Sequence, residues 1–313
     1  MPKVSVIIPV YNCERYIVES LDSVFSQDYP DLEVIVINDG STDGSLEILE
    51  QYERPIFIIN QENSGSAVAR NAGMAKARGE YIAFLDSDDK WLPGKLKRQV
   101  EFLESNLDYG LVYSNWVCWT SNSNGEFIDQ DFKNQKDSII ISRPLSGWLY
   151  CDLLQNSIVW TSSVLIRYSL YEKIGTFDTA LRRGQDYDYW IRVSRKTKIH
   201  KLDGIHAVYR TNSESVTNRP NEINYEYIVL KNSINKWGYT SPNGEKTNKA
   251  IINRKLSHIN FIFSYYHYHN NAPTIALPAI VTSIRYTPFK LKSWMYLLLI
   301  ATKYLYNFIL LKK

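Results

Sequence analysis

The chain has 313 residues, 44% of them hydrophobic, enough for one large domain or a domain with an appendage. A formal net charge of +3 is too small to indicate nucleic-acid binding. The cysteines Cys13, Cys118 and Cys151 are widely spaced, which excludes a disulfide framework and a cysteine zinc site and favours a reducing compartment. The first residues lack the long apolar run of a signal peptide, so we expect a cytoplasmic location.

Short apolar runs alternate with helical patterns over the first third of the chain. This alternation indicates βαβ units, and therefore a mostly parallel sheet with helices on both faces. The strands are expected at 4–9, 33–38, 56–60 and 81–85. The helices are expected at 14–27, around Leu46 and Leu49, at 66–77, and in a segment that carries Leu96, Val100 and Leu103.

The pattern changes after residue 105, where loops become longer. The elements expected there are a strand at 109–116, a loop at 120–137, a strand at 158–166, a helix at 186–196, and one or two strands at 198–210. After residue 221 the chain has successive helical patterns, and no Gly/Ser linker separates them from the preceding part. We therefore expect an α/β domain over 1–220 and a helical C-terminal extension over 221–313.

Three acids, Asp86, Asp88 and Asp89, directly follow the apolar strand YIAFL. Ligands of open α/β sheets bind at the carboxyl ends of strands, and buried acids there are costly without a cation. Hard divalent cations prefer carboxylate oxygens, and Mg²⁺ commonly bridges carboxylates to phosphates. The sequence therefore predicts a divalent-cation site, although an isolated DxD also fits a capped turn before a helix.

Two further polar stretches point to the same crevice. The stretch NDGSTDGS at 38–45 follows the second predicted strand, so it should lie at the same edge of the sheet as Asp86. The stretch GQDYDYWIR at 184–192 begins a predicted helix, with Asp186 and Trp190 on one face. Acids in a first helical turn are stabilised by the helix dipole alone, so spacing leaves open whether Asp186 accepts a proton.

Together these stretches resemble one family. The chain resembles the family 2 glycosyltransferases with the GT-A fold, as found in bacterial cell-surface polysaccharide assembly. The resemblance runs over roughly residues 3–215. The matching stretches, in the family's order, are VSVIIPVYN at 4–12, INDGSTDGS at 37–45, ARNAG at 69–73, GEYIAFLDSDD at 79–89, SSVLIRYSLYEKIGTFD at 162–178 and GQDYDYWIR at 184–192.

The resemblance implies a nucleotide-diphosphate sugar as donor, and a UDP-sugar is the first expectation. It implies that Pro9, Tyr11 and Asp39 surround the nucleotide base, with Asp39 hydrogen-bonded to it. It places Arg70 near the donor. Tyr209-Arg210 would lie in a donor-side loop.

The resemblance also assigns the metal and the base. Asp86 is expected at the ribose and the metal, and Asp88 is expected to coordinate the Mn²⁺ or Mg²⁺ that bridges the diphosphate. Asp186 matches the catalytic acid of the family. The family often has Glu before that acid, whereas this chain has Gln185, which removes one neighbouring negative charge.

The expected reaction is transfer of one hexose to an acceptor hydroxyl with inversion. A positioned carboxylate that takes the hydroxyl proton contributes on the order of 10²–10⁴-fold. The QxxRW motif of processive synthases is absent, which favours one transfer per encounter. The sequence also lacks GxGxxG after the first strand and a P-loop motif. A nucleotidyltransferase of related fold and an inactive homologue acting as a membrane scaffold remain alternatives.

The last helical pattern, WMYLLLIATKYLYNFILL at 294–311, is almost wholly apolar or aromatic. Lys303 and Asn307 form a narrow polar stripe, and lysines flank the segment. A central Lys is costly in a bilayer core, so the pattern favours a helix lying on the inner face of the cell membrane over a spanning helix. Such a location fits a sugar or lipid-linked oligosaccharide acceptor. A soluble helical cap packed on 255–268 is the alternative.

Overall fold

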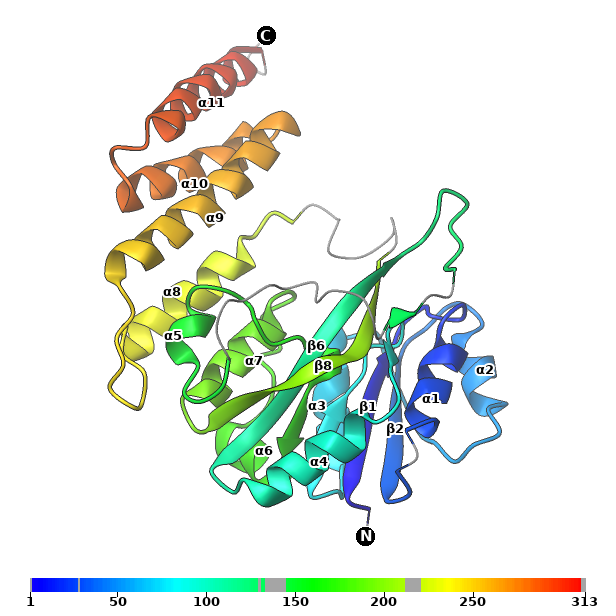
Figure 1. Cartoon of the computed structure of the whole chain (residues 1–313). Coiled ribbons are helices and arrows are strands. Elements are labelled where there is room, and N and C mark those ends of the chain that lie inside the picture. The colour runs from blue at the N-terminus through cyan, green and yellow to red at the C-terminus, as the bar shows by residue number, and fades with distance from the viewer. Residues whose placement is uncertain (1, 28, 129–130, 133–144, 212–220, 311–313) are drawn as a thin grey trace. The chain divides into compact units, whose positions relative to one another are not determined.

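The computed structural model describes residues 2–27, 29–128, 131–132, 145–211 and 221–310, and only the backbone of 307–310. Part of the predicted loop, 129–130 and 133–137, lies outside these ranges. The chain divides into two compact units (Figure 1), one of Met1–Leu153 with Ser157–Arg219 and one of Leu154–Asn156 with Pro220–Lys313. The assignment of catalysis to 1–220 and of an accessory role to 221–313 stays a prediction.

Within the described residues, eight strands form one sheet in the order β3-β2-β1-β4-β7-β6-β8-β5. The pairs among β1, β2, β3 and β4 are parallel, as is β6 with β8, whereas β7 and β5 pair in the antiparallel direction. The predicted fold class, a mostly parallel α/β sheet of GT-A type, is confirmed. The strands are β1 (Val4–Val10), β2 (Leu32–Asp39), β3 (Phe57–Gln61), β4 (Tyr81–Phe84), β5 (Lys90–Trp91), β6 (Tyr109–Thr120), β7 (Leu165–Arg167) and β8 (Lys198–Thr211).

Helices cover both faces of this sheet because strand β1 is apolar on both sides. Val4, Val6, Ile8 and Val10 form one hydrophobic cluster with residues of α1 and α4. Side chains alternate along a strand, so Ile7 lies on the other face, where it meets α3. The helices of this unit are α1 (Ile17–Phe25), α2 (Ser45–Glu50), α3 (Ser66–Lys76), α4 (Lys95–Ser105), α5 (Tyr150–Leu153), α6 (Tyr168–Ile174) and α7 (Gln185–Ser194).

Helix α3 approaches the sheet closely at Gly73, the glycine of the ARNAG stretch. A Cβ atom at this position would lie 2.5 Å from Ile7 Cγ2 and 2.8 Å from Ile37 Cδ1. Only glycine therefore lets the helix axis come this near to β1 and β2 without displacing their side chains. This close packing fixes the position of Arg70, three residues earlier on the same helix.

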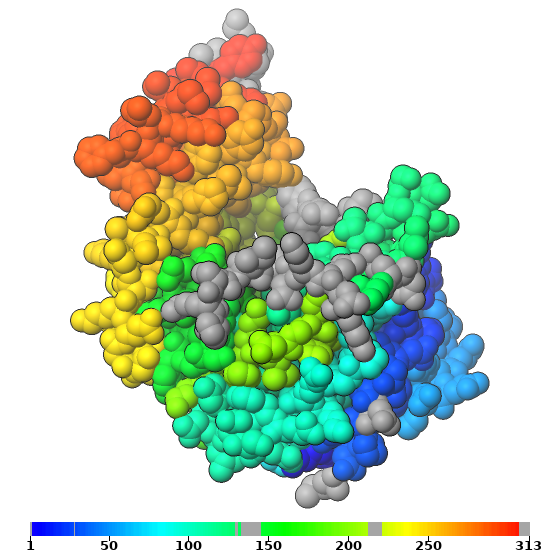
Figure 2. Space-filling model, viewed as in Figure 1, coloured from blue at the N-terminus to red at the C-terminus, as the bar shows by residue number. Residues whose placement is uncertain are grey.

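Strands β6 and β8 are long, with 12 and 14 residues. They pair along most of their length, up to Thr120 beside Thr211. Figures 1 and 2 show the segment that follows β6 projecting beyond the neighbouring strands. The far end of β8 therefore carries residues past the edge where the other parallel strands end.

The strand predicted at 158–166 is a correction. The structure has a strand only at Leu165–Arg167, preceded by a 3₁₀ turn, η2 (Thr161–Ser163). The Ser162 hydroxyl accepts a hydrogen bond from the Asp86 N–H at 3.1 Å and donates to Asp89 Oδ2 at 2.7 Å. The Ser163 hydroxyl donates to the Trp160 carbonyl at 2.7 Å, and a local bond of this kind competes with strand pairing and favours the turn.

The second unit is helical, as predicted after residue 221. A small core of Phe261, Ala276, Ile280 and Ile300 joins its last three helices. The Lys303 ammonium donates to the Tyr268 carbonyl at 3.0 Å. None of the helices in the described ranges combines the length and apolarity needed to span a membrane. The helices are α8 (Tyr225–Trp237), α9 (Lys249–His269), α10 (Pro273–Tyr286) and α11 (Leu291–Leu310).

Candidate active site

The acidic turn after β4 is held by hydroxyl groups from two other segments. The Asp89 N–H donates to the Asp86 carbonyl at 3.0 Å, which closes the turn. The Ser20 hydroxyl, on α1, lies 2.7 Å from the Ser87 carbonyl and 2.6 Å from the Asp89 carbonyl. Ser162 contacts the turn from η2. The turn is therefore a fixed structure, set by contacts remote in sequence.

Asp86 is paired with Arg70. The Arg70 Nη2 lies 2.5 Å from Asp86 Oδ1, and the Arg70 side chain is buried. Burial lowers the pKa of Arg70, but the carboxylates of Asp86 and Asp186 outweigh it, so this pKa lies above its ordinary value. Among the described residues, Nε and Nη1 of Arg70 have no hydrogen-bond partner. Arg70 is therefore paired with the acidic turn, and within the described chain it has two buried donors without a partner.

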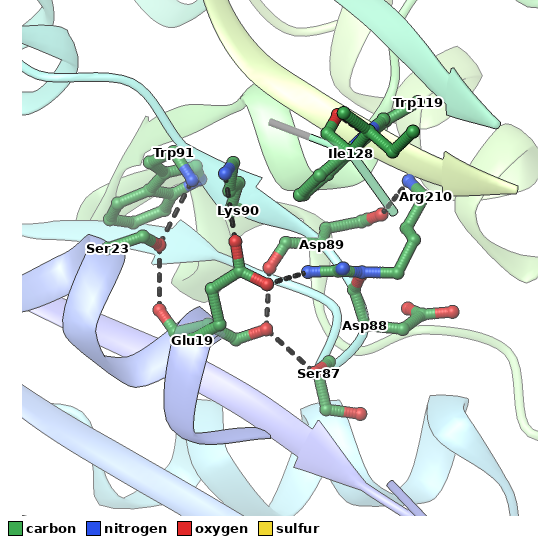
Figure 3. Close-up of polar contacts among 11 residues, drawn as sticks. Glu19, Ser23, Ser87, Asp88, Asp89, Lys90, Trp91, Trp119, Ile128 and Arg210 are labelled. Atoms are coloured by element: carbon green, nitrogen blue, oxygen red, sulfur yellow. Dashed lines mark hydrogen bonds and ion pairs between the residues drawn. The ribbon is translucent and has the colours of Figure 1, made fainter. Parts of the chain in front are cut away.

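Asp88 and Asp89 have different environments. Burial and the neighbouring Asp86 carboxylate raise the pKa of Asp88 to about 6. Burial, then Asp88 and Asp86, raise the pKa of Asp89 well above its usual range. Both oxygens of Asp89 are used, Oδ2 by Ser162 and Oδ1 by the Arg210 N–H at 3.2 Å. Figure 3 shows the Asp88 carboxylate outside the network of dashed contacts.

These acids fit a divalent cation. Asp86 and Asp88 supply hard oxygen ligands, and their mutual repulsion would be relieved by a bound cation. Across the described ranges, no three His, Cys, Asp or Glu side chains are arranged as a complete metal site. A cation at this turn would therefore need further oxygen ligands from water or phosphate, which Mg²⁺ commonly takes.

Asp39, predicted at the nucleotide base, is buried against the loop that follows β3. Its Oδ1 accepts from Gln61 Nε2 at 2.7 Å and from the Ser64 N–H at 2.9 Å, and its Oδ2 accepts from the Gly65 N–H at 2.8 Å. A carboxylate has about four acceptor positions, so room remains for one more bond. In this structure Asp39 organises the start of α3, and its contact with a base stays a prediction.

The loops after β1 and β2 are joined by hydrogen bonds. Asn12, with a positive φ of 50°, accepts from the Thr42 N–H at 2.8 Å through Oδ1. The Glu14 carboxylate accepts from the Gly44 N–H at 2.7 Å. Pro9 lies buried in β1, and Tyr11 directly follows that strand with its side chain 49% exposed. Both loops follow carboxyl ends of paired parallel strands, so they form one rim.

Asp186 lies in the first turn of α7, after Gly184, whose φ is 71°. Its Oδ1 accepts from the Tyr187 N–H at 2.8 Å. Gln185 donates to the Ser66 hydroxyl at 2.8 Å, which ties the start of α7 to the start of α3. This contact brings the predicted base towards the helix that carries Arg70.

The rest of α7 holds the helix in place. Trp190 is fully buried beside Phe84 and Phe177. Arg192 pairs with Asp188 at 2.8 Å and donates to the Thr176 carbonyl at 2.8 Å. Asp188 is therefore engaged in an ion pair, whereas the Asp186 carboxylate accepts from a backbone N–H.

The structure adds residues that the sequence patterns did not single out: Glu19, Ser20, Ser162 and the engaged carboxylate of Asp89. Ser20 and Ser162 carry no local signal, because a serine on a helix face or in an apolar run is common. Asp89 belongs to the DSDD stretch, but spacing does not distinguish a buried, fully bonded acid from a ligand.

Comparison with known proteins identifies the family. The family model for glycosyl transferase family 2 matches residues 5–174. TuaG of Bacillus subtilis, a glycosyltransferase named for teichuronic acid biosynthesis, is 35% identical over 243 residues, 75% of this chain and 83% of TuaG. An uncharacterised glycosyltransferase of Rickettsia prowazekii is 34% identical over 221 residues, 68% of this chain and 67% of that protein. The chain belongs to glycosyltransferase family 2, as the resemblance predicted.

Two solved structures share the fold. TarS of S. aureus, residues 1–349 with UDP-GlcNAc, matches with a TM-score of 0.64 and 21% identity, over 91% of this chain and 82% of that one. The mannosyltransferase PcManGT of Pyrobaculum calidifontis, with GDP-Man and Mn²⁺, matches with a TM-score of 0.62 and 20% identity, over 98% and 88%. At these identities the likeness establishes the fold alone.

Proposed function

We propose that this glycosyltransferase transfers one hexose from a nucleotide-diphosphate sugar to an acceptor hydroxyl with inversion. A UDP-sugar is the first candidate for the donor. Mn²⁺ or Mg²⁺ would bind at Asp86 and Asp88, and Asp186 would be the general base. The observation that carries the proposal is helix α3, whose Arg70 pairs with Asp86 at 2.5 Å and whose Ser66 accepts a hydrogen bond from Gln185, next to Asp186, at 2.8 Å. Helix α3 thus contacts both the proposed cation site and the start of the helix that carries the proposed base.

The chemistry assigned to each residue follows from its surroundings. Asp186 accepts the proton of the acceptor hydroxyl, which is a poor nucleophile without a base. When bound, the cation supplies positive charge to the leaving diphosphate. The two free N–H donors of Arg70 are preorganised for developing negative charge, because they are buried and fixed. One base opposite the leaving group gives a single displacement, and therefore inversion.

The donor can be tested by thermal stabilisation. We expect UDP with Mn²⁺ to raise the midpoint of thermal unfolding, because a ligand at ~100 times its Kd adds about 2.7 kcal/mol. TarS in complex with UDP-GlcNAc and PcManGT with GDP-Man and Mn²⁺ make UDP and GDP the first probes. GDP, dTDP and each nucleotide without cation are the comparison arms. Should no nucleotide shift the midpoint with either cation, the proposed activity fails and an inactive homologue is favoured.

Helix α11 supports a proposed membrane contact. The apolar residues Leu291, Trp294, Met295, Leu298 and Leu299 are exposed, with Leu291 at 83% and Leu298 at 69%. Their spacing places them on one side of the helix. Ile300 faces the core of the helical unit instead. The soluble cap and the membrane contact therefore concern different sides of the same helix.

We propose that the exposed side of α11 lies on the cytoplasmic face of the cell membrane, near a lipid-linked oligosaccharide acceptor. Lys290 and Lys292 lie at the start of the helix with their ammonium groups 4.5 Å and 5.5 Å from the Phe261 ring centroid, so the exposed apolar side chains carry the proposed contact. Lys312, Lys313 and the Asn307 side chain lie outside the described part. The assignment of TuaG to teichuronic acid biosynthesis supports a cell-surface polysaccharide pathway.

Substituting Leu291→Glu and Leu298→Glu together is expected to abolish vesicle binding. Removing two leucines from a membrane interface costs about 3 kcal/mol or more, which is ~100-fold in partitioning. The measurement is flotation with vesicles containing anionic phosphatidylglycerol, with Ile262→Glu on α9 as control, since Ile262 is also exposed. If the unsubstituted chain does not float, α11 serves only the helical cap.

A further inference from the structure

Arg210, one residue before the end of β8, contacts the acidic turn and helix α1 together (Figure 3). Its Nε donates to the Asp88 carbonyl at 2.8 Å, and its backbone N–H donates to Asp89 Oδ1 at 3.2 Å. Its Nη2 donates to Glu19 Oε2 at 2.6 Å. The Arg210 side chain is 3% exposed. One buried cation therefore joins three segments that are remote in sequence.

Aromatic rings fix the plane of this guanidinium. The Arg210 Cζ lies 4.6 Å, 4.7 Å and 4.8 Å from the ring centroids of Tyr16, Trp119 and Phe127. Such distances give cation–π attraction, and the planar group loses its freedom to rotate between them. The guanidinium can therefore hold Asp88 and Glu19 in a set geometry, which a flexible ammonium would not do.

Glu19 is anchored in turn by a second cation. Lys90, directly after the acidic turn, lies 2.8 Å from Glu19 Oε1, while Arg210 uses Oε2. The Glu19 carboxylate therefore bridges Lys90, which follows the turn, and Arg210, which bonds the Asp88 carbonyl. The C-terminal end of the turn is therefore tied to α1 through this one side chain.

We propose that Glu19 and Arg210 are positioning residues, which hold the main chain at Asp88 so that its carboxylate faces the cation and the donor diphosphate. Arg210 bonds the carbonyl of Asp88 and not its carboxylate. Asp89 has both oxygens engaged, so it stabilises the turn. The inference rests on the proposed function, because the cation site is part of it. Partners of this kind orient metal ligands in many proteins.

A matched control exists at the other end of the sheet. Glu33 forms an ion pair with Arg78 at 2.7 Å and accepts from the Ser5 hydroxyl at 2.6 Å. Ser5 and Glu33 are paired near the starts of β1 and β2, whereas the acidic turn follows the carboxyl end of β4. Loss of the Glu33 carboxylate removes a partly buried ion pair with Arg78 and leaves the contacts of the acidic turn in place.

The test compares Glu19→Gln, Arg210→Lys and Glu33→Gln in the full chain. Calorimetric titration of Mn²⁺ into protein saturated with UDP should give ~10- to 100-fold weaker binding for the first two variants, as for other partners of metal ligands. Hydrogen exchange of the peptide that spans 86–91 should be faster in both. Glu33→Gln should change neither quantity. The double variant should add little to either single change, because both act through one contact.

The outcomes separate the two proposals. If the unsubstituted chain binds Mn²⁺ with neither UDP nor GDP, the proposed function fails and the positioning role fails with it. If it binds, but Glu19→Gln and Arg210→Lys bind Mn²⁺ as tightly as Glu33→Gln, the positioning role alone is overturned. Faster exchange at 86–91 with unchanged Mn²⁺ affinity overturns it too, since the pair would then serve stability only.

Discussion

Substituting Asp186→Asn is expected to lower turnover at least ~100-fold while leaving donor affinity nearly unchanged. The amide keeps the shape of the side chain, and its oxygen can still accept from the Tyr187 N–H, so the start of α7 should be preserved. Only the ability to take a proton is lost. The measurement is kcat and KM for the donor that the thermal screen selects, with UDP affinity measured by titration.

Asp188→Asn serves as the comparison on the same helix. Asp188 is paired with Arg192, so this variant should lower stability more than turnover. Should Asp186→Asn turn over like the unsubstituted chain, the base must be sought elsewhere, and a large loss for Asp188→Asn would identify it there.

The second expected result concerns the cation. EDTA should abolish transfer, added Mn²⁺ or Mg²⁺ should restore it, and Asp88→Ala should lose donor binding and turnover. A bound cation contributes several kcal/mol to stabilising transition-state charge, so turnover should fall at least ~100-fold. Initial rates across a range of Mn²⁺ concentrations, for the unsubstituted chain and for Asp88→Ala, measure this loss of turnover.

An acid far from the turn provides the control. The Asp108 side chain is 74% exposed and forms an ion pair with Lys198, the first residue of β8. Asp108→Ala removes one carboxylate but should leave the Mn²⁺ dependence unchanged. Full activity in EDTA, or an Asp88→Ala variant with the same Mn²⁺ dependence as Asp108→Ala, would show that Asp88 is not a metal ligand.

The fold could be predicted because apolar runs and helical patterns alternate at short range. Val4–Val10 is buried on both faces, as a parallel strand requires, and its sequence is apolar except at Ser5. The strand predicted at 158–166 was wrong over most of its length. Apolar content there is high, but Ser162 bonds the acidic turn rather than a neighbouring strand. Periodicity does not carry information about such a tertiary contact.

The candidate site could be predicted only in part. Asp86 and Asp88 follow β4 and Asp39 is the last residue of β2, so the sheet topology brings their loops to one edge. Whether a carboxylate is free or engaged depends on partners from elsewhere, as the three hydrogen bonds to Asp39 demonstrate. No sequence pattern indicates a role for Glu19, because a glutamate in the first turn of a helix is common.

The contact between Glu19 and Arg210 spans 191 residues of sequence, and it bears on how the protein is made. At ordinary translation speeds of about 5–20 residues per second, roughly 10–40 s separate the synthesis of the two residues. In the later part of that interval the βαβ units at the N-terminus have been synthesised, but the acidic turn still lacks Arg210. A nascent chain that has not yet reached β8 therefore carries a turn whose Asp88 carbonyl and Asp89 carboxylate lack their bonds to Arg210. On the ribosome, this region should be among the last to acquire protection, and a chain released early should be prone to degradation.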